Sequence, residues 1–81
     1  MEPEDFTDIT RLATERLLKE HGTFLVGVDM GNAQNNLYAV ESFYVEYVDY
    51  GDNTHDVFAY YDSPRLDKFL RQMDLRELFR G

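Results

Sequence analysis

Hydrophobic positions near the start of the chain recur every three to four residues. Between residues 4 and 21 the apolar side chains fall on one helical stripe, formed by Phe6, Ile9, Leu12, Ala13 and Leu17. Acidic residues come early in this segment and basic residues come late, which suits the helix dipole. Gly22 is a typical residue just after a helix end. The pattern predicts an N-terminal helix over 4–21.

The pattern then becomes typical of strands. Residues 23–29, 37–50 and 54–61 are rich in β-branched and aromatic side chains. Short polar connections containing Gly and Asn separate these runs, so we expect a three-stranded antiparallel meander. The run 37–50 is unusually long for a strand, and a β-bulge near Glu41 and Ser42 would let it bend with its sheet.

The last part of the chain predicts helices again. Ser63 can cap a helix that begins with Pro64. The apolar stripe of this C-terminal helix is Leu66, Phe69, Leu70 and Met73. Asp74 and Glu77 have the spacing of a capping box for a short terminal helix. We therefore expect one α+β domain over residues 1–81.

Charge and composition limit the kinds of partner and of chemistry that we expect. The 81 residues include 16 Asp or Glu and 8 Lys or Arg, and residues 23–62 contain no Lys or Arg. Such a surface repels phosphate backbones and favours cationic partners, so direct nucleic-acid binding is not expected. The chain has no Cys, which excludes thiolate chemistry. Its acidic start and the lack of a long apolar run predict a cytoplasmic protein with no membrane partner.

Tyrosines are concentrated in the central part of the chain, and all six lie between residues 38 and 61. In the run 37–50, large apolar side chains occupy both odd and even positions, which point to opposite faces of a strand. Both faces of the sheet therefore need a cover. The terminal helices on opposite faces, a second copy of the chain, or a different partner could each supply it. Tyrosine is enriched at interfaces. We expect a face that binds a partner and includes Tyr38, Tyr44, Glu46, Val48 and Tyr50.

The expected function is therefore a non-enzymatic interaction module that self-associates, as a homodimer, through this tyrosine-rich face. The alternative is an acidic decoy or inhibitor that binds a basic site on another protein, because carboxylates and aromatic rings together attract Lys or Arg. A metal-dependent enzyme that uses the turn 49–56 is a third possibility. No catalytic residue and no cofactor is expected.

Two short motifs resemble ligand sites. Residues 27–31, GVDMG, are similar to the phosphate-binding turn of actin-like and heat-shock-chaperone ATPases. However, 81 residues cannot supply the two lobes of that fold, so we expect a hairpin loop there. The turn 49–56 offers Asp49, Asp52 and Asp56 as candidate calcium ligands, but its spacing matches no EF-hand. Asp, Gly and Asn are also the residues that a hairpin turn needs.

Several strand and cap residues recur in a recognisable order: GTFL at 22–25, NLYAV at 36–40, FYVE at 43–46, then Phe58, Ser63, Leu66 and Leu70. Over roughly residues 20–72 the chain thereby resembles short uncharacterised bacterial proteins, mainly of the Bacteroidetes group. The resemblance implies a shared α+β fold and a bacterial cytoplasmic setting. It implies no particular activity.

Overall fold

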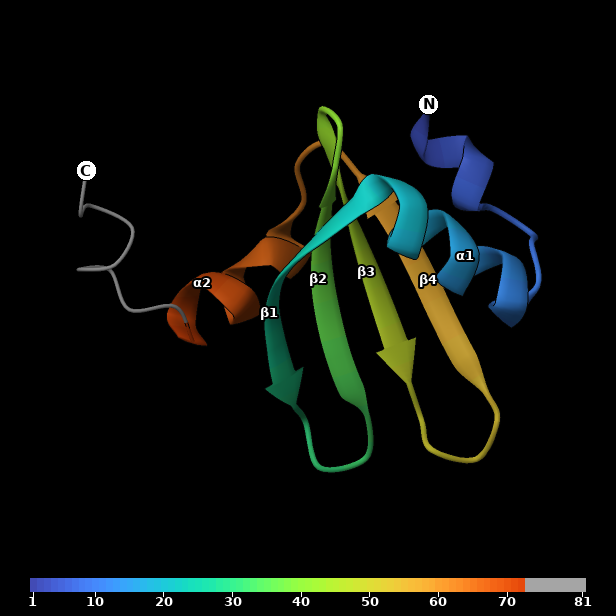
Figure 1. The fold of residues 1–81 in the computed structure, drawn as a ribbon. Helices are drawn as coiled ribbons and strands as arrows, with labels where there is room; N and C mark the ends of the chain where they lie inside the picture. Colours follow the sequence, from blue (N-terminus) through green and yellow to red (C-terminus); the bar gives the residue numbers. More distant parts are fainter. Residues whose placement is uncertain (73–81) are drawn as a thin grey trace.

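The computed structural model describes residues 1–72 and shows an α+β fold with a four-stranded antiparallel sheet (Figure 1). The strands lie side by side in chain order: β1 (Gly22–Asp29), β2 (Gln34–Val40), β3 (Phe43–Asp49) and β4 (His55–Tyr60). The helical elements are the 3-10 turns η1 (Pro3–Phe6) and η2 (Pro64–Leu66) and the α-helices α1 (Arg11–His21) and α2 (Asp67–Gln72). The predicted antiparallel meander is confirmed. Across residues 1–72, no helix is both long enough and apolar enough to cross a membrane.

The predicted strand 37–50 is in fact two strands, so the prediction of a three-stranded sheet is wrong. A hairpin with the two-residue loop Glu41-Ser42 joins β2 to β3, and Val40 pairs with Phe43 across it. Glu41 has φ of +52°, a left-handed conformation that Gly or Asn adopts more readily than Glu. The bulge expected at this point is therefore a turn. The register shift of the sheet lies in β1 instead, between Phe24 and Val26.

The predicted helix 4–21 is divided into η1 and α1. Asp8 lies between them with φ of +58°, outside the helical region. The Thr10 hydroxyl then accepts a hydrogen bond from the backbone N–H of Ala13 and caps α1. Because α1 begins anew at residue 11, its buried face differs from the predicted stripe. Leu12 is 68% exposed, whereas Leu18 is buried.

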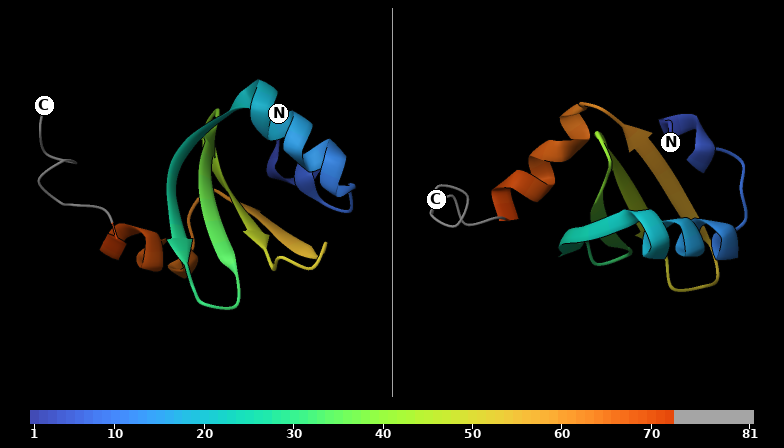
Figure 2. Two further views of the ribbon diagram at one scale, coloured as in Figure 1. Left: turned by 60° about the horizontal axis from the view of Figure 1, so that its bottom comes forward. Right: turned by 45° about the horizontal axis from the view of Figure 1, so that its top comes forward.

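The helices of the chain cover both faces of the sheet. Figure 2 shows η1 and α1 on one face and η2 and α2 on the other. The first face, called the α1 face here, buries a cluster of Phe6, Leu18, Val40, Phe43, Val45 and Tyr47. The second, called the α2 face, buries a smaller cluster of Val28, Leu37 and Phe69. The sequence analysis left three possible covers for the second sheet face, and the structure shows that the chain's own helices cover it.

The start of the C-terminal helix agrees with the prediction. Ser63 Oγ accepts a hydrogen bond from the backbone N–H of Arg65 at 3.2 Å, and Pro64 is the first residue of η2. In α2, Phe69 is buried and Leu70 is exposed. The predicted stripe residue Met73 and the predicted short terminal helix lie outside the described residues.

The GVDMG motif lies at the end of β1 and in the loop 30–33 that leads to β2, so the hairpin-loop prediction is confirmed. Asp29 Oδ1 accepts a hydrogen bond from the backbone N–H of Gly31 at 2.8 Å. Gly31 has φ of +87°, a conformation that favours glycine. These features are what a hairpin turn requires, and they account for the motif.

Candidate functional site

The five residues predicted to form one binding face lie in different places. Tyr38 packs against the core cluster of the α1 face. Tyr44, Glu46 and Val48 belong to the α2 face, where Glu46 and Val48 are buried and Tyr44 is half-buried. Tyr50 follows β3 and is exposed. Across the two-residue hairpin, even-numbered residues of β2 lie on the same face as odd-numbered residues of β3. The even-numbered residues of 37–50 therefore do not form one surface.

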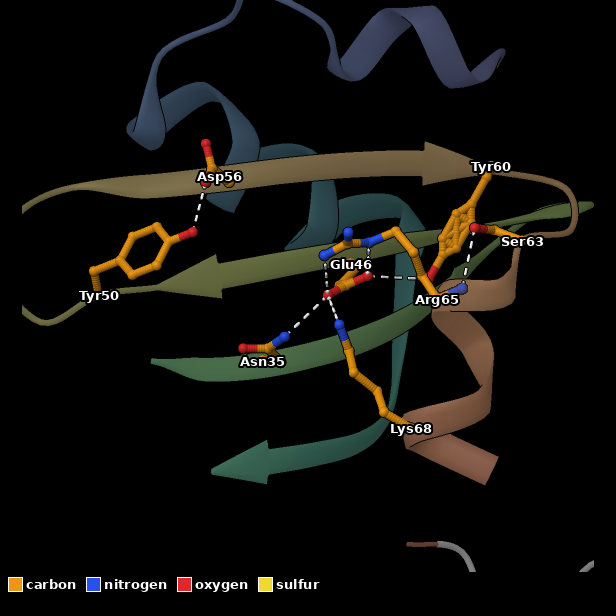
Figure 3. A network of polar contacts seen from close by, with 8 residues as sticks. All are labelled: Asn35, Glu46, Tyr50, Asp56, Tyr60, Ser63, Arg65 and Lys68. Carbon is orange, nitrogen blue, oxygen red and sulfur yellow. Dashed lines mark hydrogen bonds and ion pairs between the residues drawn. The ribbon is translucent and has the colours of Figure 1, made fainter. Parts of the chain in front are cut away.

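Glu46 is the centre of a polar cluster on the α2 face (Figure 3). Its side chain is completely buried. Arg65 donates to both carboxylate oxygens, at 2.8 and 3.1 Å, and Lys68 Nζ donates to Oε2 at 2.5 Å. Asn35 Nδ2 donates at 3.0 Å and the Tyr60 hydroxyl donates at 3.3 Å. We call these five residues the Glu46 cluster.

The cluster joins elements that are far apart in the sequence. Asn35, Glu46 and Tyr60 come from β2, β3 and β4, whereas Arg65 comes from η2 and Lys68 from α2. Arg65 and Lys68 are three residues apart, a spacing that places both side chains on the same side of a helical segment. The cap and proline at the start of η2 therefore set the position from which both cations reach Glu46.

The electrostatics of the cluster keep Glu46 ionised. Burial by itself would raise the pKa of Glu46, because it disfavours the charged form. The hydrogen bonds and positive charges of Arg65 and Lys68 outweigh burial, and they hold the pKa of Glu46 below its ordinary value. Burial and the neighbouring carboxylate raise the pKa of Tyr60, so its hydroxyl keeps the proton that it donates.

The position of Arg65 is also supported by an aromatic ring. Its guanidinium carbon lies 3.8 Å from the centroid of the Phe58 ring, within the range of a cation–π interaction. Phe58 pairs with Glu46 across β3 and β4, so the ring and the carboxylate that hold the guanidinium are neighbours. Each charged group of the cluster is thus engaged by another member, an arrangement that fixes α2 on the sheet.

The sequence analysis identified Glu46 but missed the other four members. Arg65 and Lys68 are 19 and 22 residues away from Glu46, so no local pattern connects them. One signal was available. An acid within a strand that is apolar on both faces needs a cationic partner. The nearest Lys or Arg to Glu46 in the sequence is Arg65.

Asn35 has one polar atom without a partner. Because Nδ2 donates to the Glu46 carboxylate, which can only accept, Oδ1 must point away from it (Figure 3). Oδ1 is buried and accepts no hydrogen bond from the described residues. Asn35 lines a hollow of about 200 Å³ together with Val48, Tyr50 and Arg65, among others. This hollow has room for several water molecules, at about 30 Å³ each.

A second candidate site lies at the end of the sheet that carries both the loop 30–33 and the loop 50–54 (Figure 1). We call this region, with the strand ends beside it, the loop end. Asp29, Asp49 and Tyr50 line a hollow of about 320 Å³ there. Asp49 pairs with Arg11 of α1 at 2.9 Å, and the Tyr50 hydroxyl donates to Asp56 at 2.6 Å. The loop end is therefore acidic, with an accessible aromatic ring among its carboxylates.

The three candidate metal ligands of the turn 49–56 do not converge on one point. Each accepts hydrogen bonds from a different neighbour: Asp49 from Arg11, Asp52 from Thr54 and Asp56 from Tyr50. Within residues 1–72, no group of three or more His, Asp or Glu side chains is placed to hold a metal ion. The hydrogen bonds of these carboxylates shape the turn.

Comparisons of the chain with protein-family models, with curated proteins and with solved structures find no match. The resemblance to short bacterial proteins therefore stays a prediction, and the function has to be argued from the site geometry.

Proposed function

We propose that the protein is a non-enzymatic interaction module that binds a basic segment of another protein at the loop end. The observation that carries this proposal is the hollow between the two hairpin loops, lined by Asp29, Asp49 and Tyr50. A Lys or Arg side chain entering this hollow would meet carboxylates and the face of an aromatic ring. The proposal keeps the predicted class of function and adopts the basic partner that the sequence left as the alternative.

The charge distribution supports a basic partner. Residues 22–62 include the whole sheet and both loops of the loop end, and they contain seven Asp or Glu and no Lys or Arg. Opposite charge accelerates the encounter of two proteins and helps to select the partner. Met30, which is 51% exposed, adds an adaptable apolar contact beside the acids.

The arrangement of the titratable groups supports binding without catalysis. Glu46, the buried acid, is engaged by two cations and lies beneath the C-terminal helix. His55 stacks on the ring of Tyr47, with 5.6 Å between centroids. Among the described residues, the buried carboxylate of Glu46 and the imidazole of His55 thus take part in packing contacts. Catalysis needs a free group within reach of a substrate.

The sequence predicted self-association through the tyrosine-rich face on the premise that the chain leaves one face of its sheet uncovered. That premise is not met, because η2 and α2 cover the face to which Tyr44, Glu46 and Val48 belong. Self-association itself remains a proposal, and a different surface favours it, as argued below.

A peptide titration tests binding at the loop end. The ¹⁵N-labelled protein is titrated with an Arg- and Lys-rich peptide, and with an acidic peptide of equal length as the control. We expect the basic peptide alone to shift the amide resonances of residues 29–34 and 49–54. The shifts should shrink as salt rises, because screening weakens a complex that depends on charge. Shifts spread evenly over the sheet, or none, would contradict the proposal.

Matched variants locate the site. In Asp29→Asn/Asp52→Asn the side-chain oxygens that accept hydrogen bonds in the turns are retained, but two charges are removed from the loop end. We expect this variant to bind the basic peptide several-fold more weakly. Glu4→Gln/Glu20→Gln makes the same change of net charge on η1 and α1, and its affinity should remain close to that of the wild type. Equal losses in the two variants would show that only the overall charge matters.

A further inference from the structure

Strand β1 forms one edge of the sheet. It pairs with β2 on one side, and none of the described strands lies on its other side. Alternate backbone N–H and C=O groups along this outer edge therefore have no strand partner. Residues 22–28 contain no charged residue and no proline, the residues that usually protect an edge from pairing.

Large apolar side chains are exposed at the same edge. Phe24 is 55% exposed and Leu25 is 40% exposed. Helix α2 packs against β1 and projects beyond it, away from the other strands, as Figures 1 and 2 show. Leu70 on this helix is 46% exposed. A strand added beside β1 would lie alongside α2 and bury part of this apolar surface.

The opposite edge of the sheet is different. η1 packs against β4, and the hydroxyl of Tyr61, just after β4, donates to Glu2 at 3.1 Å. β4 also carries a charged residue, Asp56. These features disfavour an open array in which β1 of one chain pairs with β4 of the next. Pairing of β1 with another β1 closes after two copies.

We propose that β1 of one chain pairs antiparallel with β1 of a second copy, which joins two sheets into one. Two identical edges related by a two-fold axis present complementary N–H and C=O groups to each other. Each chain carries a net charge of −8, so two copies repel each other over much of their surface, but residues 22–28 are neutral.

The charges at the ends of the paired strands agree with this arrangement. When the two strands pair along their whole length, the two Asp29 carboxylates lie seven residues apart, about 24 Å along the strand direction. This separation exceeds the screening length of about 8 Å at physiological salt. The register shift between Phe24 and Val26 interrupts the edge, so the interface is small and the dimer is weak.

Light scattering and sedimentation over a range from about 10 μM to about 1 mM chain test the proposal, a range chosen for a weak complex. We expect the mass of the wild type to rise toward that of a dimer with concentration. Leu25→Glu should remain monomeric, because it places like charges at the paired edges. Leu12→Glu makes the same change of charge at an exposed position of α1, and it should dimerise like the wild type.

Two results would overturn the proposal: a wild type that stays monomeric throughout, or a folded Leu25→Glu variant that dimerises as the wild type does. Circular dichroism establishes whether each variant folds. Should Leu25→Glu fail to fold, amide exchange in the wild type decides, because exchange over residues 23–28 slows with concentration only when this edge pairs. Binding at the loop end is a separate proposal, and the basic peptide should still bind monomeric Leu25→Glu.

Discussion

Helix α1 packs on a sheet face whose core is mainly aromatic and aliphatic, whereas α2 packs on a face that buries a carboxylate. On the α1 face, Phe6 and Phe43 make an edge-to-face contact with 6.0 Å between centroids. On the α2 face, Phe69 supplies the apolar contact, and Arg65 and Lys68 bind Glu46. The sheet thus holds α1 mainly by apolar burial, with a partly exposed ion pair between Arg11 and Asp49, and it holds α2 by apolar burial together with ion pairs to a buried carboxylate.

This difference has consequences for stability and for order. Apolar burial is non-directional and is largely independent of pH. A buried ion pair depends on geometry and on ionisation, and the cost of desolvating the two charges offsets much of their attraction. Helix α2 has only six residues, too few to be stable in isolation, so its position depends on the sheet. The comparison predicts that the α1 face determines whether the domain folds, and that the Glu46 cluster determines how α2 is placed.

The largest expected effect comes from the α1 face. Phe43→Ala removes a buried ring from the centre of the larger core cluster, and we expect a loss of about 3–5 kcal/mol in the free energy of unfolding. Urea denaturation followed by circular dichroism measures this loss, and both helices should unfold together with the sheet. A loss below about 1 kcal/mol would show that this face does not dominate the stability.

A smaller effect is expected from the cluster on the α2 face. Glu46→Gln keeps the shape of the side chain but leaves two cations without a counter-charge, and breaking a buried pair in this way is costly. Because Arg65 and Lys68 are partly solvated, we expect the free energy of unfolding to fall by about 2–3 kcal/mol at pH 7. This loss is at or below the lower end of the losses measured when fully buried pairs are broken.

The control for this substitution is Glu20→Gln, the same change at an exposed position of α1, which should alter stability by less than about 0.5 kcal/mol. Similar losses in the two variants would contradict a special role of Glu46. A loss in Glu46→Gln that equals the loss in Phe43→Ala would remove the distinction between the two faces.

The sequence predicted much of the fold because several elements have local signals. The positions of β1 and β4, the cap at Ser63 and the hairpin loop after Asp29 all follow from residue type and spacing. The hairpin at Glu41-Ser42 could not be predicted in this way. Glu-Ser is not one of the residue pairs preferred in two-residue hairpin loops, and the apolar pattern continues on both sides of the turn. No local break therefore separates β2 from β3.

The candidate site was predictable only in part, for the same reason. Glu46 and Tyr50 are conspicuous in a mainly apolar segment, so they could be selected from the sequence. Their grouping with Tyr38 failed because the unrecognised hairpin changes which residues share a face. The partners of Glu46 come from elements whose contact depends on the tertiary fold. Likewise, Phe24 and Leu25 look like ordinary strand residues until the strand order shows that β1 lies at an edge.

The pH dependence of the α2 face follows from the lowered pKa of Glu46. Since folding lowers this pKa, the contribution of Glu46 to stability is fully present above the ordinary value of 4.5 and is lost as the pH falls through the lower, folded value. Protonation would weaken the ion pairs with Arg65 and Lys68. The apolar contacts of the α1 face, such as Phe6–Phe43, involve no ionisation and should persist for as long as the domain is folded.

The most direct test compares ring contacts on the two faces by nuclear Overhauser spectroscopy at pH 7 and at about pH 3, a pH below the ordinary glutamate pKa. We predict that contacts of the Phe69 ring with Leu37 and Val28 weaken at low pH in the wild type, while the Phe6–Phe43 contact remains. In Glu46→Gln the Phe69 contacts should be weak at both pH values. Phe69 contacts that are unchanged by acid and by this substitution would contradict the account, because α2 would then be held without the Glu46 cluster.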